Sequence, residues 1–159
     1  LEVATPLPAS LAEIADDVVA LLDARAEKRG ITLRREGEGV AAADAQRLKE
    51  ALLNVVDNAI EASPGGTEVR IAVGVREGTA SFRVSDAGPS IPPEVLARIG
   101  TPYFTTKPEG TGLGVVLARA VLAQHGGTLA VDRASGRTEV TLAWPASVAG
   151  CCAPDEASP

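Results

Sequence analysis

Two asparagines, Asn54 and Asn58, have a spacing that suits metal chemistry on a helix. They lie four residues apart in a segment whose apolar residues recur with helical period, so both amides fall one turn apart on the polar face. Mg²⁺ takes oxygen ligands, keeps several waters and is commonly shared with nucleotide phosphates. The pair therefore predicts either a magnesium site or an ordinary solvated helix face, which also carries Glu50, Asp57 and Glu61.

A candidate phosphate-binding element lies further along the chain, where Gly110-Thr-Gly-Leu-Gly114 opens a predicted helix. Backbone N–H groups at a helix N-terminus form an anion site, and the nearby Lys107 offers a mobile positive charge. Taken alone, glycine triplets also occur in dinucleotide-binding folds, and a loop lysine is usually solvated. No predicted strand directly precedes the glycines, which argues against the dinucleotide interpretation.

Asp86 marks the point where a predicted strand gives way to a glycine-containing turn, Asp86-Ala-Gly88. A carboxylate is a hydrogen-bond acceptor only, which suits the exocyclic amine of adenine. A glycine at this position lets the backbone pass close to a bound base. The alternative is an ordinary aspartate at a strand-to-turn boundary.

In this order and spacing, the asparagine pair and the segments 86–91, 102–107 and 110–115 resemble the motif series of one family. The chain is similar to the catalytic ATP-binding domain of sensor histidine kinases, within the superfamily of gyrase, heat-shock chaperone and MutL-type ATPases. The Asn58-Ala-Ile-Glu-Ala form is familiar in the nitrogen-regulatory subgroup. The resemblance covers roughly Leu7 to Pro145.

The resemblance implies ATP and Mg²⁺ as cofactors and assigns roles to particular residues. Asn58 would be the principal Mg²⁺ ligand with Asn54 assisting it, Asp86 would recognise adenine, and Lys107 would contact phosphate; Asn54, Asn58 and Lys107 form the catalytic set. The remaining ATP contacts implied by the family are Gly88, Ile91, Thr105, Thr106, Gly110, Thr111, Gly112, Leu113, Gly114 and Thr138.

Asn54 replaces a glutamate that activates water in the hydrolytic relatives. An amide cannot take a proton at neutral pH and so cannot act as a general base. This favours transfer of the phosphoryl group to another acceptor, although Glu50, one turn earlier, leaves weak hydrolysis open.

Three further positions depart from the family pattern. Ser90 replaces a second glycine at the start of the lid, and Glu61 stands where many members carry a phosphate-contacting lysine. Arg137 replaces a glycine just before Thr138, where a large side chain could crowd the pocket. These changes support, slightly, a degenerate nucleotide-binding module as the alternative function.

Local patterns predict the elements that carry these residues. A capping box, Ser10-Leu-Ala-Glu13, opens the first helix, and Asp44 is a good N-cap for the second. The expected helices span 10–29, 44–63, 93–99 and 113–125, and the expected strands span 31–35, 39–43, 67–75, 80–85, 128–132 and 138–144. The fold predicted is an α/β (α+β) two-layer sandwich of the Bergerat ATP-binding type, with helices on one face of a mixed, mostly antiparallel sheet.

The chain is expected to hold one domain over residues 10–145, preceded by the end of an upstream linker over 1–9 and followed by a disordered tail over 146–159. Its 159 residues, 45% of them hydrophobic, suffice for one core. Adjacent Cys151 and Cys152 in the tail suit neither a disulfide framework nor a metal site, and we expect reduced thiols in a cytoplasmic protein.

Composition also restricts the partners. The net charge is −6, from 15 basic and 21 acidic residues without a dense Lys/Arg cluster, so nucleic acid is a poor candidate. No apolar run approaches a membrane span, and no direct membrane contact is expected of this segment. Any membrane anchor is expected in segments outside it.

His125, the only histidine, is predicted to be a structural residue rather than the phosphoacceptor. It stands at a helix end before Gly126-Gly127, which is a C-terminal capping context. Glu2-Val-Ala-Thr-Pro-Leu7 is similar to the trailing part of the family's acceptor motif, but Leu1 occupies the place of the histidine. The acceptor is therefore expected on another domain.

The predicted function is transfer of the γ-phosphoryl group of ATP to a histidine on a separate dimerisation domain, with a response regulator downstream. A stand-alone serine kinase of the anti-sigma type is a third possibility. The amphipathic 10–29 segment, which resembles the linker region after a dimerisation domain, argues against it.

Overall fold

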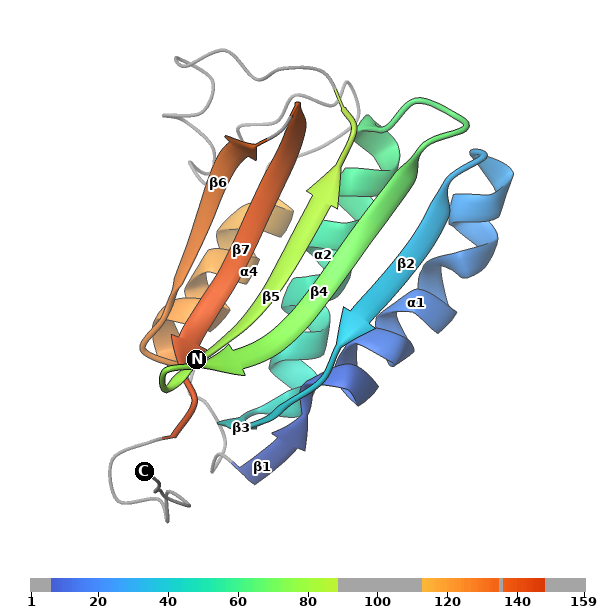
Figure 1. The fold of residues 1–159 in the computed structure, drawn as a ribbon. Coiled ribbons are helices and arrows are strands. Elements are labelled where there is room, and N and C mark those ends of the chain that lie inside the picture. The colour runs from blue at the N-terminus through green and yellow to red at the C-terminus, as the bar shows by residue number, and fades with distance from the viewer. Residues whose placement is uncertain (1–6, 89–112, 135, 148–159) are drawn as a thin grey trace.

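The computed structural model describes residues 7–88, 113–134 and 136–147, and its centre is a five-stranded sheet (Figure 1). The strand order is β2-β4-β5-β7-β6. The neighbours β2 and β4 run parallel, and every other adjacent pair is antiparallel. The strands are β2 (Thr32–Gly37), β4 (Glu68–Arg76), β5 (Thr79–Asp86), β6 (Thr128–Ala134) and β7 (Arg137–Pro145). The mixed, mostly antiparallel sheet is thus confirmed.

Three helices cover one face of this sheet: α1 (Leu11–Lys28), α2 (Ala45–Ala62) and α4 (Leu113–Gln124) (Figure 1). They lie side by side, with α2 between the other two, and the opposite face of the sheet carries no helix in the described ranges. The two-layer sandwich is therefore confirmed.

Short-range capping sets the limits of these helices. The Ser10 side chain accepts a hydrogen bond from the Glu13 N–H, and the Asp44 side chain accepts one from the Arg47 N–H, as the sequence predicts. α1 ends at Lys28, and Gly30 directly after its C-cap has a φ of 75°, a left-handed conformation that glycine adopts without steric cost. Local signals of this kind suffice to place helix ends.

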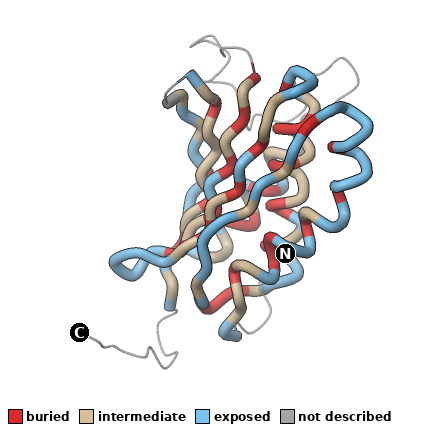
Figure 2. The backbone as a smooth tube through the Cα atoms, turned by 45° about the vertical axis from the view of Figure 1, so that its right-hand side comes forward, coloured by how far each residue is buried: buried red, intermediate tan, exposed pale blue. Residues whose placement is uncertain are grey.

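The core lies between the sheet and the helices. Figure 2 shows buried and exposed positions alternating along the strands, as a sheet covered on one face requires. Phe82 of β5 and Trp144 of β7 are fully buried, with ring centroids 5.4 Å apart. The indole N–H of Trp144 donates to the Ala42 carbonyl at 3.2 Å, so the largest core residue also has its polar atom satisfied.

A second, two-stranded sheet lies at the end of the molecule where α1 and α2 begin. β1 (Leu7–Ser10) pairs antiparallel with β3 (Val40–Ala43). The sequence predicts the second strand but assigns residues 1–9 to a linker, because four residues with two prolines nearby carry no clear strand period. The pairing arises from contact with a segment thirty or more residues away, which no local pattern reveals.

Ala146, the first residue of the segment assigned to the tail, also joins the fold. Ala146 N–H donates to the Gly78 carbonyl, and Ala42 N–H donates to the Ala146 carbonyl, each at 2.8 Å. The helix predicted over 93–99 and the two cysteines lie outside the described residues.

Candidate functional site

The candidate site is centred on the end of β5, where Asp86 is the last strand residue. Asp86 pairs with Thr138 of β7, and both residues are only 5% exposed. One carboxylate oxygen of Asp86 accepts a hydrogen bond from the Gly88 N–H at 2.7 Å. A carboxylate has about four acceptor positions, so this contact leaves capacity for a donor from a ligand.

Burial raises the pKa of Asp86, because a low-dielectric environment disfavours the charged form. The Gly88 N–H and the positive charges of Arg137 and Arg133 oppose that rise. A buried acidic group with a perturbed pKa is a candidate functional residue. Asp86 thus has the burial and the acceptor chemistry that recognition of a base amine requires.

Gly88 permits a close approach between this strand end and the last turn of α2. A Cβ atom at position 88 would lie 2.8 Å from an oxygen of the Asp86 carboxylate and 3.0 Å from the Ala62 carbonyl oxygen. The first distance is shorter than real Cβ contacts and the second is unusually tight, so only glycine fits here without displacement of its neighbours. The contact brings Asp86 beside the helix that carries Asn54 and Asn58.

The polar face of α2 carries two kinds of residue: acidic residues that bind α1 and the two candidate asparagine ligands. Asp57 and Glu61 turn towards α1, where Arg25 binds them at 2.5 Å and 2.6 Å. The hydrogen bond to Asp57 is the main cause that raises the pKa of Arg25. Asn54 and Asn58 lie half-buried on the same helix, and their role as amide ligands stays a prediction.

Glu61 therefore makes a helix–helix contact at the position of the family's phosphate-contacting lysine. Its backbone carbonyl also accepts from Arg29 at 3.0 Å. Glu50, the alternative water-activating group, is exposed and accepts from Gln46 at 3.3 Å.

The two asparagine amides are the candidate metal ligands. Among the described residues, no group of three or more His, Cys, Asp or Glu side chains could hold a metal ion. The donor set at Asn54 and Asn58 fits a hard cation that completes its shell with water and phosphate oxygens.

α4 begins at Leu113 and contains Gly114, as the glycine triplet predicts. The first N–H groups of a helix have no partner within the helix, and such groups can bind an anion. The other predicted ATP contacts lie outside the described residues: Ile91, Thr105, Thr106, Lys107, Gly110, Thr111 and Gly112. Ser90 lies outside them as well.

Arg137 lies on the face of the sheet opposite to Asp86 and Thr138. Successive strand residues point to alternate faces; Thr138 faces the helices, whereas Arg137 reaches Ser85 and Glu68 on the open face. The expectation that Arg137 crowds the pocket is therefore wrong. Arg133, which the sequence does not single out, lies on the pocket face and donates to the Thr138 hydroxyl at 3.2 Å.

His125 joins the end of α4 to the start of α2. Its Nδ1 lies 2.8 Å from the Val121 carbonyl, and its Nε2 accepts from the Asp44 N–H at 3.0 Å. Because Nε2 accepts in this pattern, Nδ1 is the nitrogen that donates to the Val121 carbonyl. Both nitrogens are engaged, as the predicted structural role requires.

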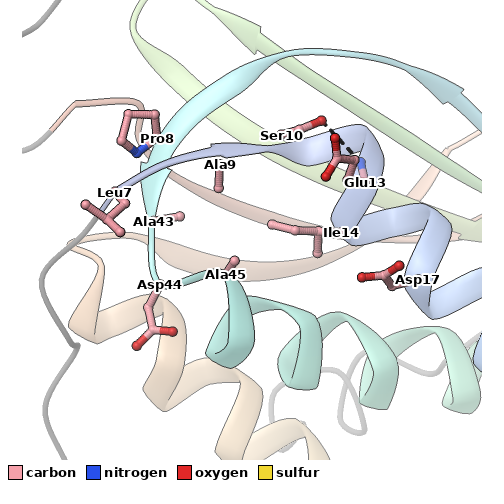
Figure 3. A pocket seen from close by; sticks show the side chains of 10 residues that line it. All are labelled: Leu7, Pro8, Ala9, Ser10, Glu13, Ile14, Asp17, Ala43, Asp44 and Ala45. Atoms are coloured by element: carbon pink, nitrogen blue, oxygen red, sulfur yellow. Dashed lines mark hydrogen bonds between the residues drawn. The ribbon is translucent and has the colours of Figure 1, made fainter.

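A shallow groove of about 470 Å³ lies at the opposite end of α2 from Asp86. Figure 3 shows it between β1 and the first turns of α1 and α2, with Ile14 as an apolar wall and Glu13, Asp17 and Asp44 nearby. An 18-residue helix is about 27 Å long, so this groove is separate from the candidate site.

Comparison with known proteins agrees with this arrangement. The sequence model described as "Histidine kinase-, DNA gyrase B-, and HSP90-like ATPase" matches residues 43–148, more than half of the chain. Sporulation kinase A of Bacillus subtilis (strain 168) is 36% identical over 126 residues, which make up 77% of this chain and 21% of that protein. Sensor histidine kinase ZraS of Klebsiella oxytoca is 44% identical over 98 residues, or 60% of this chain and 21% of that protein.

Solved structures show the same fold. The catalytic domain of histidine kinase ThkA superposes with a TM-score of 0.82 at 28% identity, covering 91% of this chain and 97% of that one. Full-length ShkA in complex with AMPPNP gives 0.81 at 27% identity, covering 91% of this chain and 32% of that one.

The chain spans about a fifth of the length of these curated relatives. Of the helices described, none combines the length and apolar composition of a membrane span. The family match, the sandwich of three helices on a mixed sheet and the buried Asp86 beside α2 agree with one another. The chain belongs to the histidine kinase-, DNA gyrase B- and HSP90-like ATPase family, and within it to the ATP-binding catalytic domains of sensor histidine kinases.

Proposed function

We propose that this domain binds Mg-ATP between α2, the start of α4 and the end of β5, and transfers the γ-phosphoryl group to a histidine of another domain. The observation that carries the proposal is the buried Asp86 carboxylate, which Gly88 holds against the helix bearing Asn54 and Asn58. ShkA, a structural relative, has been solved with AMPPNP.

Each residue in the proposal has a defined task. Asp86 accepts a hydrogen bond from the adenine amine, and Thr138 lies across the ladder from it. Asn58, assisted by Asn54, would hold Mg²⁺, which when bound neutralises phosphate charge and orients the transferring group. Lys107 and the backbone N–H groups at the start of α4 would balance the remaining negative charge.

Catalysis in this scheme relies on positioning and charge balance. Phosphoryl transfer needs little covalent help from the protein. The position of Asn54 carries an amide that cannot deprotonate water, so the scheme favours an external nucleophile over hydrolysis. His125 has both ring nitrogens engaged, which leaves the nucleophile to a separate dimerisation domain.

The wider partners belong to the same proposal. ThkA, at 26% identity, has been solved in complex with the response regulator protein TrrA. We infer that a response regulator receives the phosphoryl group after the dimerisation domain, and that the domain works in the cytoplasm, where ATP is available.

Incubation with radiolabelled ATP tests the transfer. This chain, mixed with the histidine-bearing dimerisation domain of the same protein and Mg²⁺, should place an acid-labile, base-stable label on that domain and none on itself. Asn58→Ala should abolish the label, whereas Gln46→Ala, an exposed polar change near the other end of α2, should leave it intact.

Two outcomes would overturn the proposal. Tight ATP binding with no label on the acceptor would indicate a degenerate nucleotide-binding module. A label on His125 would show that the acceptor had been assigned wrongly.

A further inference from the structure

The guanidinium of Arg137 holds the strand end that carries Asp86. Its Nε donates to the Ser85 hydroxyl oxygen at 2.6 Å, and its Nη2 donates to the Ser85 carbonyl at 2.9 Å. The same Nη2 donates to the Glu68 carbonyl at 2.6 Å. One side chain of β7 therefore reaches across β5 to the first residue of β4.

The Ser85 carbonyl belongs to the peptide that joins Ser85 to Asp86. β5 ends at Asp86, so this is the last peptide before the chain leaves the sheet. A planar guanidinium binds several acceptors in a fixed geometry. Its hydrogen bond to the Ser85 carbonyl restricts rotation of the Ser85–Asp86 peptide, to which the Asp86 Cα is attached. Arg137 thus acts on the orientation of Asp86 from the opposite face of the sheet.

Arg137 also acts on the charge of Asp86. Burial raises the pKa of this carboxyl, whereas the Gly88 N–H, Arg137 and Arg133 lower it. The two arginines reach the strand end from β7 and β6. The same side chain that orders the peptide therefore favours the ionised acceptor.

The other charged groups near this strand end are turned away from it. On α2, Asp57 and Glu61 are bound to an arginine of α1. On β4 and β7, the Glu68 side chain pairs with Arg70, and Glu139 pairs with an arginine of β5, all on the open face. Removal of the Arg137 charge should accordingly raise the pKa of Asp86, because none of these groups replaces that charge.

We propose that Arg137 is a positioning residue for base recognition, which orients the Ser85–Asp86 peptide so that the Asp86 carboxylate can accept from an adenine amine. The inference rests on the proposed nucleotide site and assigns this residue a role within it. It predicts that adenine selectivity, and not only stability, depends on a side chain outside the pocket.

Calorimetric titration of ADP and GDP tests this role. Guanine carries an oxygen where adenine carries its amine, so the ADP-to-GDP affinity ratio reports on the Asp86 acceptor. We would compare the parent chain with Arg137→Gln, Arg137→Lys and Ser85→Ala between about pH 8 and about pH 5, where carboxylates approach their titration range. Arg76→Gln is the matched control, since Arg76 is an exposed arginine at the end of β4 away from Asp86.

We expect Arg137→Gln to lower the ADP-to-GDP ratio several-fold, and the loss to grow as the pH falls, because the Asp86 carboxylate then protonates more readily. Arg137→Lys keeps the positive charge but loses the planar guanidinium that binds several acceptors. It should therefore lower the ADP-to-GDP ratio without making that loss greater at low pH. Ser85→Ala removes the hydroxyl that accepts from the Arg137 Nε, with little change in volume. It should reproduce part of the decrease in the ADP-to-GDP ratio. The ionisation of ADP itself is common to all variants and cancels in the comparison.

A lower melting temperature for Arg137→Gln, combined with the parent's nucleotide ratio and pH profile, would show a merely structural role and overturn the inference. If that variant fails to fold, an unchanged ratio in Arg137→Lys and Ser85→Ala would overturn it equally. A parent chain that binds neither nucleotide would instead remove the proposed function itself.

Discussion

At the scale of single residues, Asp86 combines two properties that oppose each other. Its burial suits discrimination between bases, because a ligand without a donor leaves the acceptor unpaired. The same burial raises its pKa, which means that the folded domain holds the proton of this group more tightly than the unfolded chain does. The charge at this position is thus maintained for function at a cost in stability.

Asp86→Asn should therefore stabilise the nucleotide-free domain at neutral pH while weakening adenine binding. Because the pKa is raised on folding, the stability of the parent falls as the pH rises from the unfolded pKa towards the folded one; the variant lacks this loss. Thermal unfolding should show a higher melting temperature for the variant at neutral pH and no difference in acid, below both pKa values.

The exposed Asp23 of α1 provides the control for this substitution. Asp23→Asn should change neither the melting temperature nor the ADP affinity. An Asp86→Asn domain that binds ADP as well as the parent does would contradict the adenine role.

At the scale of elements, the two ends of α2 are held by different contacts. At its N-cap, the Asp44 N–H donates to His125, the residue that follows α4. The last turn of α2 meets the end of β5 at Gly88. Between them, Arg25 of α1 binds Asp57 and Glu61. The helix that carries the candidate magnesium ligands is thus fixed along its length by three neighbouring elements.

His125→Ala should lower stability without affecting nucleotide binding. The change leaves the Asp44 N–H without its acceptor, at a cost of about 1–3 kcal/mol in the free energy of unfolding. α4 spans 12 residues, so the ring lies about 18 Å from the N-terminus of α4 that is proposed to bind phosphate.

Denaturant unfolding measures the loss, and ADP titration measures the binding. His125→Gln, which can offer an amide oxygen to the same N–H, should recover part of the stability. An unchanged unfolding free energy in His125→Ala would contradict the bridging role of this residue.

At the scale of the whole molecule, the proposed nucleotide site lies at the end of the sandwich where β5 and α2 both end (Figure 1). The groove beside β1 lies at the other end (Figure 3). Binding of a nucleotide would join elements from both layers, and a ligand that binds only the folded state must stabilise it.

Mg-ATP should therefore raise the melting temperature of the chain in a concentration-dependent manner. At about 100 times its dissociation constant, a ligand adds about 2.7 kcal/mol, which corresponds to roughly 5–10 °C for a domain of this size. Asn58→Ala should remove the difference between ATP with Mg²⁺ and ATP with EDTA. A flat melting temperature across the ATP series in the parent would contradict the nucleotide assignment.

Much of this protein follows from short-range patterns. Ser10 and Asp44 predict the two helix starts, because a side-chain oxygen satisfies N–H groups within the same turn. The strands expected over 67–75 and 80–85 leave a four-residue connection, in which Glu77 and Gly78 adopt the positive φ values of a tight hairpin turn. The position of Asn54 and Asn58 on one helix face likewise follows from the helical period alone. The matched family confirms the fold and the ATP-binding class of the domain.

Only the tertiary structure decides which distant groups meet. β1 pairs with β3, Asp57 and Glu61 turn to Arg25, and Arg137 bonds to a β4 carbonyl 69 residues away in sequence. The alternation of a strand shows that Arg137 and Thr138 point to opposite faces, but not which of them faces the pocket. Strand register settles that question, because a shift by one residue would exchange the two faces, and register depends on packing of the whole sheet against the helices.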